Sequence, residues 1–164
     1  MQMNASVKLD AHACICYGNG VKAYPSKTTV GAWALLLKAQ RKALASVENA
    51  LESAGLPPLG WYDALLELER AGERGLRPFE LEREMLLTQY NVSRLIDRIS
   101  KAGYVERLAC EDDGRGQLVV ITAEGKDIRR RMWTVYGPAI QVALGSHLSE
   151  REIEKLLTLL GKLV

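Results

Sequence analysis

The sequence predicts a mainly α-helical fold that carries one small β-hairpin. Apolar residues recur at steps of three, four and seven along several segments, which is the period of helices with one buried face. Late in the chain, two short runs rich in β-branched residues flank a polar, glycine-containing turn, which predicts the hairpin. The 164 residues suffice for about one ordinary domain, and the 48% hydrophobic content rules out disorder of the whole chain.

The first predicted helix is unusually long. Residues 1–25 show no sustained period, so we expect an arm outside the main fold, either disordered or packed on a dimer. Ser26 offers an N-cap, and Ala54-Gly55 ends the helix. Its apolar stripe consists of Val30, Trp33, Leu37, Leu44, Val47 and Leu51. At about 1.5 Å per residue the helix spans roughly 40 Å, so we expect part of it to pack against another chain.

Three shorter helices are predicted next. A segment rich in proline and glycine, residues 56–60, precedes a helix that begins near Trp61 and ends near Gly72. Pro78 suits the first position of a third helix that ends near Leu87. The predicted buried face of the third helix is Phe79, Leu81 and Met85.

A three-residue turn should join this third helix to a fourth. Thr88 is the predicted N-cap, and Ala102-Gly103 ends the helix. Its buried positions are Val92, Leu95, Ile96 and Ile99. The segments 104–108 and 118–121 are predicted strands around the charged turn 111–116.

Two helices complete the chain. Thr122 is the predicted cap of the first, and Gly137-Pro138 should kink it. Ser149 and Glu152 form the capping-box pattern that opens the last helix. Its apolar face is Ile153, Leu156, Leu157, Leu160 and Leu163. Long apolar stripes at both chain ends favour a homodimer, since a monomer would expose them.

Two short helices followed by a tight hairpin match the plan of a winged helix-turn-helix, whose second helix enters the DNA major groove. The predicted DNA-facing residues of that helix are Thr88, Gln89, Tyr90, Asn91, Ser93, Arg94 and Arg98. Gln or Asn pairs with adenine and Arg with guanine, and Thr88 with the first backbone N–H groups can hold a phosphate. The alternative is an ordinary solvated helix face, which has a similar composition.

The hairpin tip adds a second predicted contact with DNA. Arg115 lies between two glycines, where its guanidinium could enter a minor groove, and Asp113 could orient it. The alternative is a solvated turn with incidental charge. Net charge does not decide between them, because residues 88–122 hold five basic and five acidic side chains and the whole chain carries only +2. Binding would therefore depend on where the arginines point.

The motifs of this region resemble those of the MarR family, the multiple antibiotic resistance regulators. They are VSRLIDR at 92–98, AGYVER at 102–107 and DGRGQ at 113–117, followed at the family's usual distance by ITAEG at 121–125. The resemblance implies a homodimeric regulator, by the family's habit a repressor, with two winged helix-turn-helix domains on a palindromic operator. Residues 57–122 would form the DNA-binding domain, and residues 26–56 and 123–164 the helical dimerisation domain.

The resemblance also implies release from DNA by a small aromatic acid. Trp33, Arg41, Trp61 and Tyr62 are the predicted lining of such a pocket, because aromatic walls and one cation suit an aromatic carboxylate. The alternative is that Trp61 and Tyr62 are simple core residues. A further alternative for the whole chain is a winged-helix module that contacts proteins without binding DNA.

The remaining chemistry-bearing residues are few. Cys14, Cys16 and Cys110 are expected to be free thiols of a cytoplasmic protein, and no apolar run is long enough for a membrane helix. A redox-sensing regulator is an alternative, although no cysteine lies in the first helix. His12 with Cys14 and Cys16 lacks a fourth zinc ligand. We therefore expect no metal and no cofactor, and with no nucleophile or nucleotide motif, no enzyme.

Overall fold

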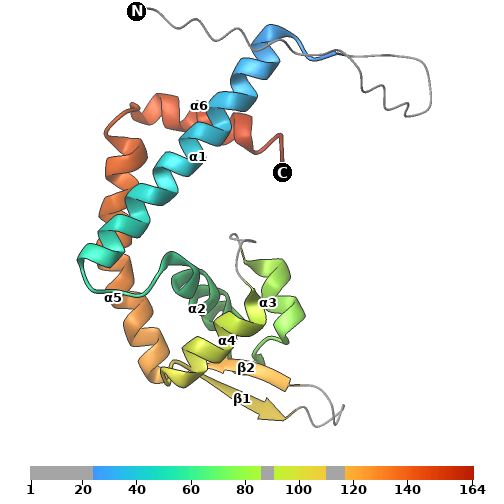
Figure 1. Ribbon diagram of the computed structural model, residues 1–164, viewed down its shortest axis with the longest axis vertical. Coiled ribbons are helices and arrows are strands. Elements are labelled where there is room, and N and C mark those ends of the chain that lie inside the picture. The colour runs from blue at the N-terminus through green and yellow to red at the C-terminus, as the bar shows by residue number, and fades with distance from the viewer. Residues whose placement is uncertain (1–23, 86–90, 110–116) are drawn as a thin grey trace, which may run out of the picture.

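The computed structural model describes residues 24–85, 91–109 and 117–164 (Figure 1). Its helices are α1 (Lys27–Ser53), α2 (Leu59–Ala71), α3 (Pro78–Glu84), α4 (Val92–Lys101), α5 (Ala123–Ile140) and α6 (Glu150–Leu160). Strands β1 (Val105–Ala109) and β2 (Gln117–Ile121) lie between α4 and α5. A 3-10 turn, η1 (Gly72–Arg74), follows α2, and a π-helical turn, η2 (Gln141–Gly145), follows α5. The predicted fold class, mainly α with a small hairpin, is confirmed.

The elements from α2 to β2, here called the winged unit, lie at one end of an elongated molecule (Figure 1). The strands pair antiparallel, with Val105 opposite Ile121 and Ala109 opposite Gln117. A separate bridge joins Leu76 to Val119, so the segment before α3 adds to the edge of the hairpin. Helices α1 and α5 pack together and extend away from the winged unit toward α6.

One hydrophobic core joins the winged unit to α1 and α5. Its fully buried large side chains are Leu51, Leu65, Leu68, Leu81, Ile96, Ile99, Met132, Val105 and Val119. The core includes only the C-terminal half of α1, through Val47 and Leu51, and α5 as far as Ala139. The stripe predicted for α1 is therefore buried at one end only.

Side-chain caps fix several helix starts where the sequence placed them. The Ser26 hydroxyl accepts a hydrogen bond from the Thr29 N–H at 3.0 Å, and the Thr122 hydroxyl accepts one from Gly125 N–H at 3.0 Å. Ser149 and Glu152 form the predicted capping box at α6. Pro78 occupies the first turn of α3. These predictions are confirmed.

Four details of the predicted fold are wrong. Helix α2 begins at Leu59, two residues before Trp61, because Pro58 in an extended conformation precedes it directly. Phe79 is 54% exposed and does not belong to the buried face of α3. Helix α3 ends at Glu84 and not near Leu87, and the predicted three-residue turn to α4 lies outside the described residues. Asn91, and not Thr88, is the N-cap of α4.

Helix α5 continues past Gly137-Pro138, where a kink was predicted, as far as Ile140. The irregular geometry lies beyond the proline, in the π-helical turn η2. Among the described residues, no helix has both the length and the apolar character that a membrane span requires.

Large apolar side chains are exposed at the end of the molecule opposite the winged unit. Helix α1 exposes Val30 at 51%, Trp33 at 62% and Leu37 at 42%, although these continue the stripe of the buried Val47 and Leu51. None of the α6 residues is buried against the described part of the chain. Exposed apolar residues near the C-terminus are Leu157, Leu159, Leu160, Leu163 and Val164.

Candidate nucleic-acid interface

Helix α4 has one buried face and one fully exposed polar face. Val92, Leu95, Ile96 and Ile99 are buried, as predicted, and hold the helix against the rest of the winged unit. The opposite face exposes Ser93, Arg94, Asp97, Arg98 and Lys101. Of the predicted contact residues, Ser93, Arg94 and Arg98 therefore lie together on one solvent-facing surface, which we call the α4 face.

Asn91 is the N-cap of α4. Its side-chain oxygen accepts a hydrogen bond from the Arg94 N–H at 3.0 Å. A free N-terminal turn of a helix exposes backbone N–H groups that attract anions, and Asn91 satisfies one of them. Pairing with adenine, as predicted, would require the side chain to leave this cap.

Arg107 of β1 connects the α4 face to the hairpin. Its guanidinium forms an ion pair with Asp97 on α4, and its Nη1 also contacts Gln117 Oε1 of β2 at 3.5 Å. One arginine thus contacts the helix and both strands. The interaction is exposed, so its contribution to stability is small, but it links α4 to both strands of the hairpin.

The Asp97–Arg107 ion pair changes the charge balance of the α4 face. The one acidic residue on the exposed side of α4 is neutralised by a cation from β1. Within the described part of the chain, Arg94, Arg98 and Lys101 have no ion-pair partner. The surface is therefore locally cationic. The equal numbers of basic and acidic residues in segment 88–122 did not indicate this, because they take no account of which charges are paired.

The other predicted contact residues lie outside the described residues. These are Thr88, Gln89 and Tyr90 before α4, and Asp113 and Arg115 between the strands. Cys14, Cys16 and Cys110, with His12, also lie outside them. The structure does show that strands β1 and β2 lead to the segment containing Arg115.

The four residues of the predicted effector pocket are not together within one chain. Trp33 and Arg41 are exposed on α1. Trp61 is half-buried and meets the Tyr104 ring edge-on at 5.9 Å. Tyr62 is buried and contacts Trp133 and Tyr136 of α5, with ring centroids 6.0 Å and 5.0 Å away.

Two residues of this aromatic cluster, Trp133 and Tyr136, were missed by the sequence prediction. Burial, with smaller contributions from Tyr62 and Asp63, raises the pKa of Tyr136, so its phenol stays neutral at physiological pH. Helical spacing could have placed Trp133 and Tyr136 on one face of α5, but nothing in the sequence indicated that this face meets Tyr62.

Comparison with known proteins identifies the winged unit. A family model described as MarR family matches residues 54–116. This winged helix belongs to the MarR family. The match covers α2 to β1 and reaches into the segment that follows β1, which agrees with the motifs at 92–98 and 102–107.

Individual relatives are similar mainly over the same region. The chain is 31% identical over 71 residues to the HTH-type transcriptional regulator PrsX of Escherichia coli, covering 43% of each protein. It is 30% identical over 89 residues to the multiple antibiotic resistance protein MarR of Escherichia coli, covering 54% of this chain and 62% of that protein. The chain therefore aligns with less than two thirds of the length of these relatives.

The shared fold extends further than the sequence similarity. A MarR family transcriptional regulator from Streptomyces coelicolor, solved in complex with DNA, superposes with a TM-score of 0.77 at 23% identity. The superposition covers 88% of this chain and 91% of that one. The long helices outside the winged helix are thus also arranged as in a solved MarR-family protein.

Proposed function

We propose that this protein is a transcription regulator, without enzymatic activity, that binds an inverted-repeat operator as a homodimer. Helix α4 inserts its exposed face into the major groove, and Arg115 reaches the minor groove from the hairpin tip. The observation that carries the proposal is the α4 face, where Arg94 and Arg98 are exposed without an ion-pair partner in the described part of the chain. The DNA complex of the Streptomyces coelicolor relative supports it.

The homodimer is supported by the half-buried stripe of α1. Val47 and Leu51 pack in the core, while Trp33 and Leu37 on the same face are exposed. Leu157 and Leu160 on α6 are exposed as well, and soluble monomers rarely leave so many large apolar side chains uncovered. A twofold partner would cover them and place two α4 helices about one DNA turn, or 34–36 Å, apart.

Repression, and release by a small aromatic acid, are the finer parts of the proposal. The cluster of Tyr62, Trp133 and Tyr136 lies where α5 meets the winged unit. An aromatic ligand that displaced these rings would change the orientation of the winged unit relative to α5. A fall in operator affinity on adding salicylate, absent with an aliphatic acid such as hexanoate, is the expected result.

The test is selection from random DNA duplexes with the purified full chain, followed by fluorescence anisotropy on the selected duplex. We expect an inverted repeat, bound by two chains, with an affinity that falls steeply as salt rises because phosphate contacts release counterions. If the protein binds no duplex even at low salt, the alternative of a winged-helix module that contacts proteins without binding DNA is favoured instead.

The Arg94→Ala variant examines the α4 face directly. Loss of a bidentate base contact should cost about 1–3 kcal/mol and relax the preference at one base pair of each half-site. Arg130→Ala is the matched control, because Arg130 is an exposed arginine of α5 paired with Asp127 of the same helix. Equal losses on specific and random DNA would reduce Arg94 to a phosphate contact.

A further inference from the structure

Helix α5 contacts a single tyrosine of the winged unit with three side chains of one face. Arg129, Trp133 and Tyr136 follow at steps of four and three, which places them on one side of the helix. The Arg129 guanidinium lies 5.9 Å from the centre of the Tyr62 ring, and the rings of Trp133 and Tyr136 lie 6.0 Å and 5.0 Å from it. Tyr62 itself is buried.

Arg129 also forms an ion pair with Glu69, which lies seven residues after Tyr62 on α2. The two paired atoms, Arg129 Nε and Glu69 Oε2, are shielded from water, and the Arg129 side chain is only 17% exposed. Salt screens a shielded ion pair less than a surface pair. Removing one member of a shielded pair also leaves the other charge buried without a partner, which is strongly destabilising. The Arg129 guanidinium therefore contacts two residues of α2, the Tyr62 ring and the Glu69 carboxylate.

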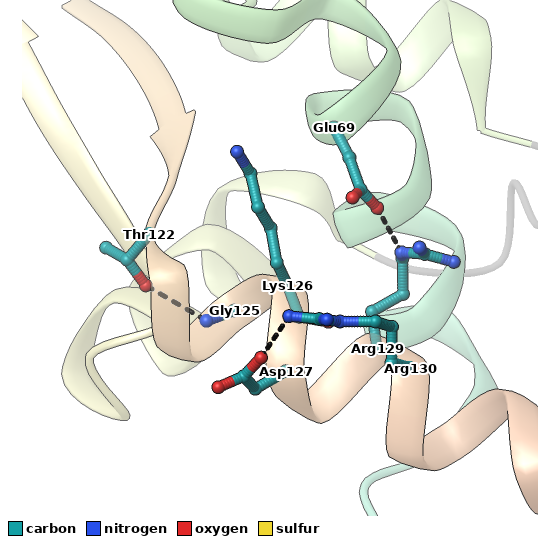
Figure 2. Close-up of polar contacts among 7 residues, drawn as sticks. All are labelled: Glu69, Thr122, Gly125, Lys126, Asp127, Arg129 and Arg130. Atoms are coloured by element: carbon teal, nitrogen blue, oxygen red, sulfur yellow. Dashed lines mark hydrogen bonds and ion pairs between the residues drawn. The ribbon is translucent and has the colours of Figure 1, made fainter.

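Figure 2 shows the contrast with the next residue. Arg129 extends from α5 to Glu69 on α2, whereas Arg130 turns back to Asp127 of its own helix. Both Arg130 and Asp127 are 66% exposed. Two neighbouring arginines thus form ion pairs of different kinds, and only that of Arg129 connects α5 to the winged unit.

The start of α5 is fixed to the winged unit at a separate point. The Thr122 hydroxyl donates to the Gly103 carbonyl at 2.8 Å, and the Thr122 N–H donates to the Tyr104 carbonyl at 3.0 Å. At Gly125, a Cβ atom would lie 2.1 Å from the Tyr104 carbonyl oxygen, so only glycine allows this approach. The apolar core and the ring contacts also hold α5 against α2, and among these contacts the Arg129 ion pair is the polar one that ties the two helices together beyond the start of α5.

We propose that Arg129 is a positioning residue that sets the angle between the winged unit and α5, and through it the separation of the two α4 helices in the dimer. The inference rests on the proposed function. Helix α5 leads from the winged unit to the exposed apolar end where the second protomer would pack, so a small rotation at Arg129 displaces α4 along the DNA. Arg129 would then determine which half-site spacing is preferred, without touching DNA.

The experiment measures affinity for a series of operators whose half-sites are moved apart or together in single base-pair steps. The wild type should prefer one spacing sharply. Arg129→Gln should lower affinity at that spacing about tenfold and flatten the preference. Arg130→Gln removes the same charge from the same helix and should leave the profile unchanged. Glu69→Gln should behave like Arg129→Gln, and the double variant should lose less than the sum of the two.

Two results would overturn the role of Arg129. One is a spacing profile that stays sharp in Arg129→Gln. The other is an equal loss at every spacing together with a lower melting temperature, which a merely structural ion pair would give. If Arg129→Gln does not fold, Glu69→Gln and Arg129→Lys provide the same comparison.

A measurement without DNA separates this inference from the proposed function. Spin labels at Ser93→Cys, with Cys14, Cys16 and Cys110 changed to serine, report the distance between the two α4 helices of the dimer. Arg129→Gln should broaden that distribution and Arg130→Gln should not. Failure of the wild-type protein to bind DNA would refute the proposed function. An unchanged distribution of α4–α4 distances in Arg129→Gln would refute the role of Arg129.

Discussion

Helices α4 and α6 have similar sequence patterns and opposite surroundings. Each begins with a side-chain cap, Asn91 or Ser149, and each has its apolar residues on one face. Helix α4 buries that face in the core of its own chain, whereas α6 buries no residue against the described chain and leaves Leu157 73% exposed. The period of a helix shows which face is apolar, but not whether the covering surface belongs to the same chain.

The largest predicted effect follows from reversing the apolar character of α6. The double variant Leu157→Glu/Leu160→Glu should halve the mass measured by light scattering, because charge in the proposed interface remains without a partner. Operator affinity should fall by about 10²–10⁴-fold, since each winged unit would bind alone.

Thr158→Glu is the control for this prediction. Thr158 is exposed on the side of α6 away from Leu157 and Leu160, and its hydroxyl donates to the Glu154 carbonyl within the helix. The Thr158→Glu variant should remain a dimer with wild-type affinity for the operator. A double variant that keeps the wild-type mass would show that α6 is not part of the interface.

A substitution on the apolar face of α4 should act on folding and not on association. Ile96 is 1% exposed, so Ile96→Ala should lower the free energy of unfolding by about 2–5 kcal/mol through lost burial and the remaining cavity. Urea unfolding at fixed chain concentration measures this, and Ser93→Ala, on the exposed side, should change it by less than about 0.5 kcal/mol. Dimer mass should be unchanged in both variants.

The comparison also shows how far the sequence could predict this molecule. Caps and periodic stripes are local features, and for this reason Ser26, Thr122, Ser149 and the buried face of α4 were predicted correctly. Phe79 has the spacing of a core residue, but it is 54% exposed and no element of the described part of the chain covers it. Contacts such as Asp97 with Arg107, or Arg129 with Glu69, join side chains of different elements, and the spacing of these residues in the sequence carries no signal.

The smallest effects concern the two caps themselves. In α6, Glu152 Oε2 accepts hydrogen bonds from the Ser149 hydroxyl at 2.7 Å and from the Ser149 N–H at 2.9 Å. These bonds hold the pKa of Glu152 below its ordinary value. Ser149→Ala removes the hydroxyl and leaves the N–H, so this pKa should rise part of the way toward the ordinary value, which an NMR titration measures.

Melting temperatures distinguish the two caps. Ser149→Ala and Asn91→Ala should each lower the melting temperature by about 2–4 °C, because Asn91→Ala leaves the Arg94 N–H without its acceptor and Ser149→Ala removes the hydroxyl that donates to Glu152 in the capping box. If α6 packs on a second protomer, the effect of Ser149→Ala should grow as the chain is diluted, because a weakened α6 also weakens association. The effect of Asn91→Ala should not depend on concentration, since α4 packs within its own chain. Equal concentration dependence in the two variants would contradict the difference between α4 and α6 from which these predictions start.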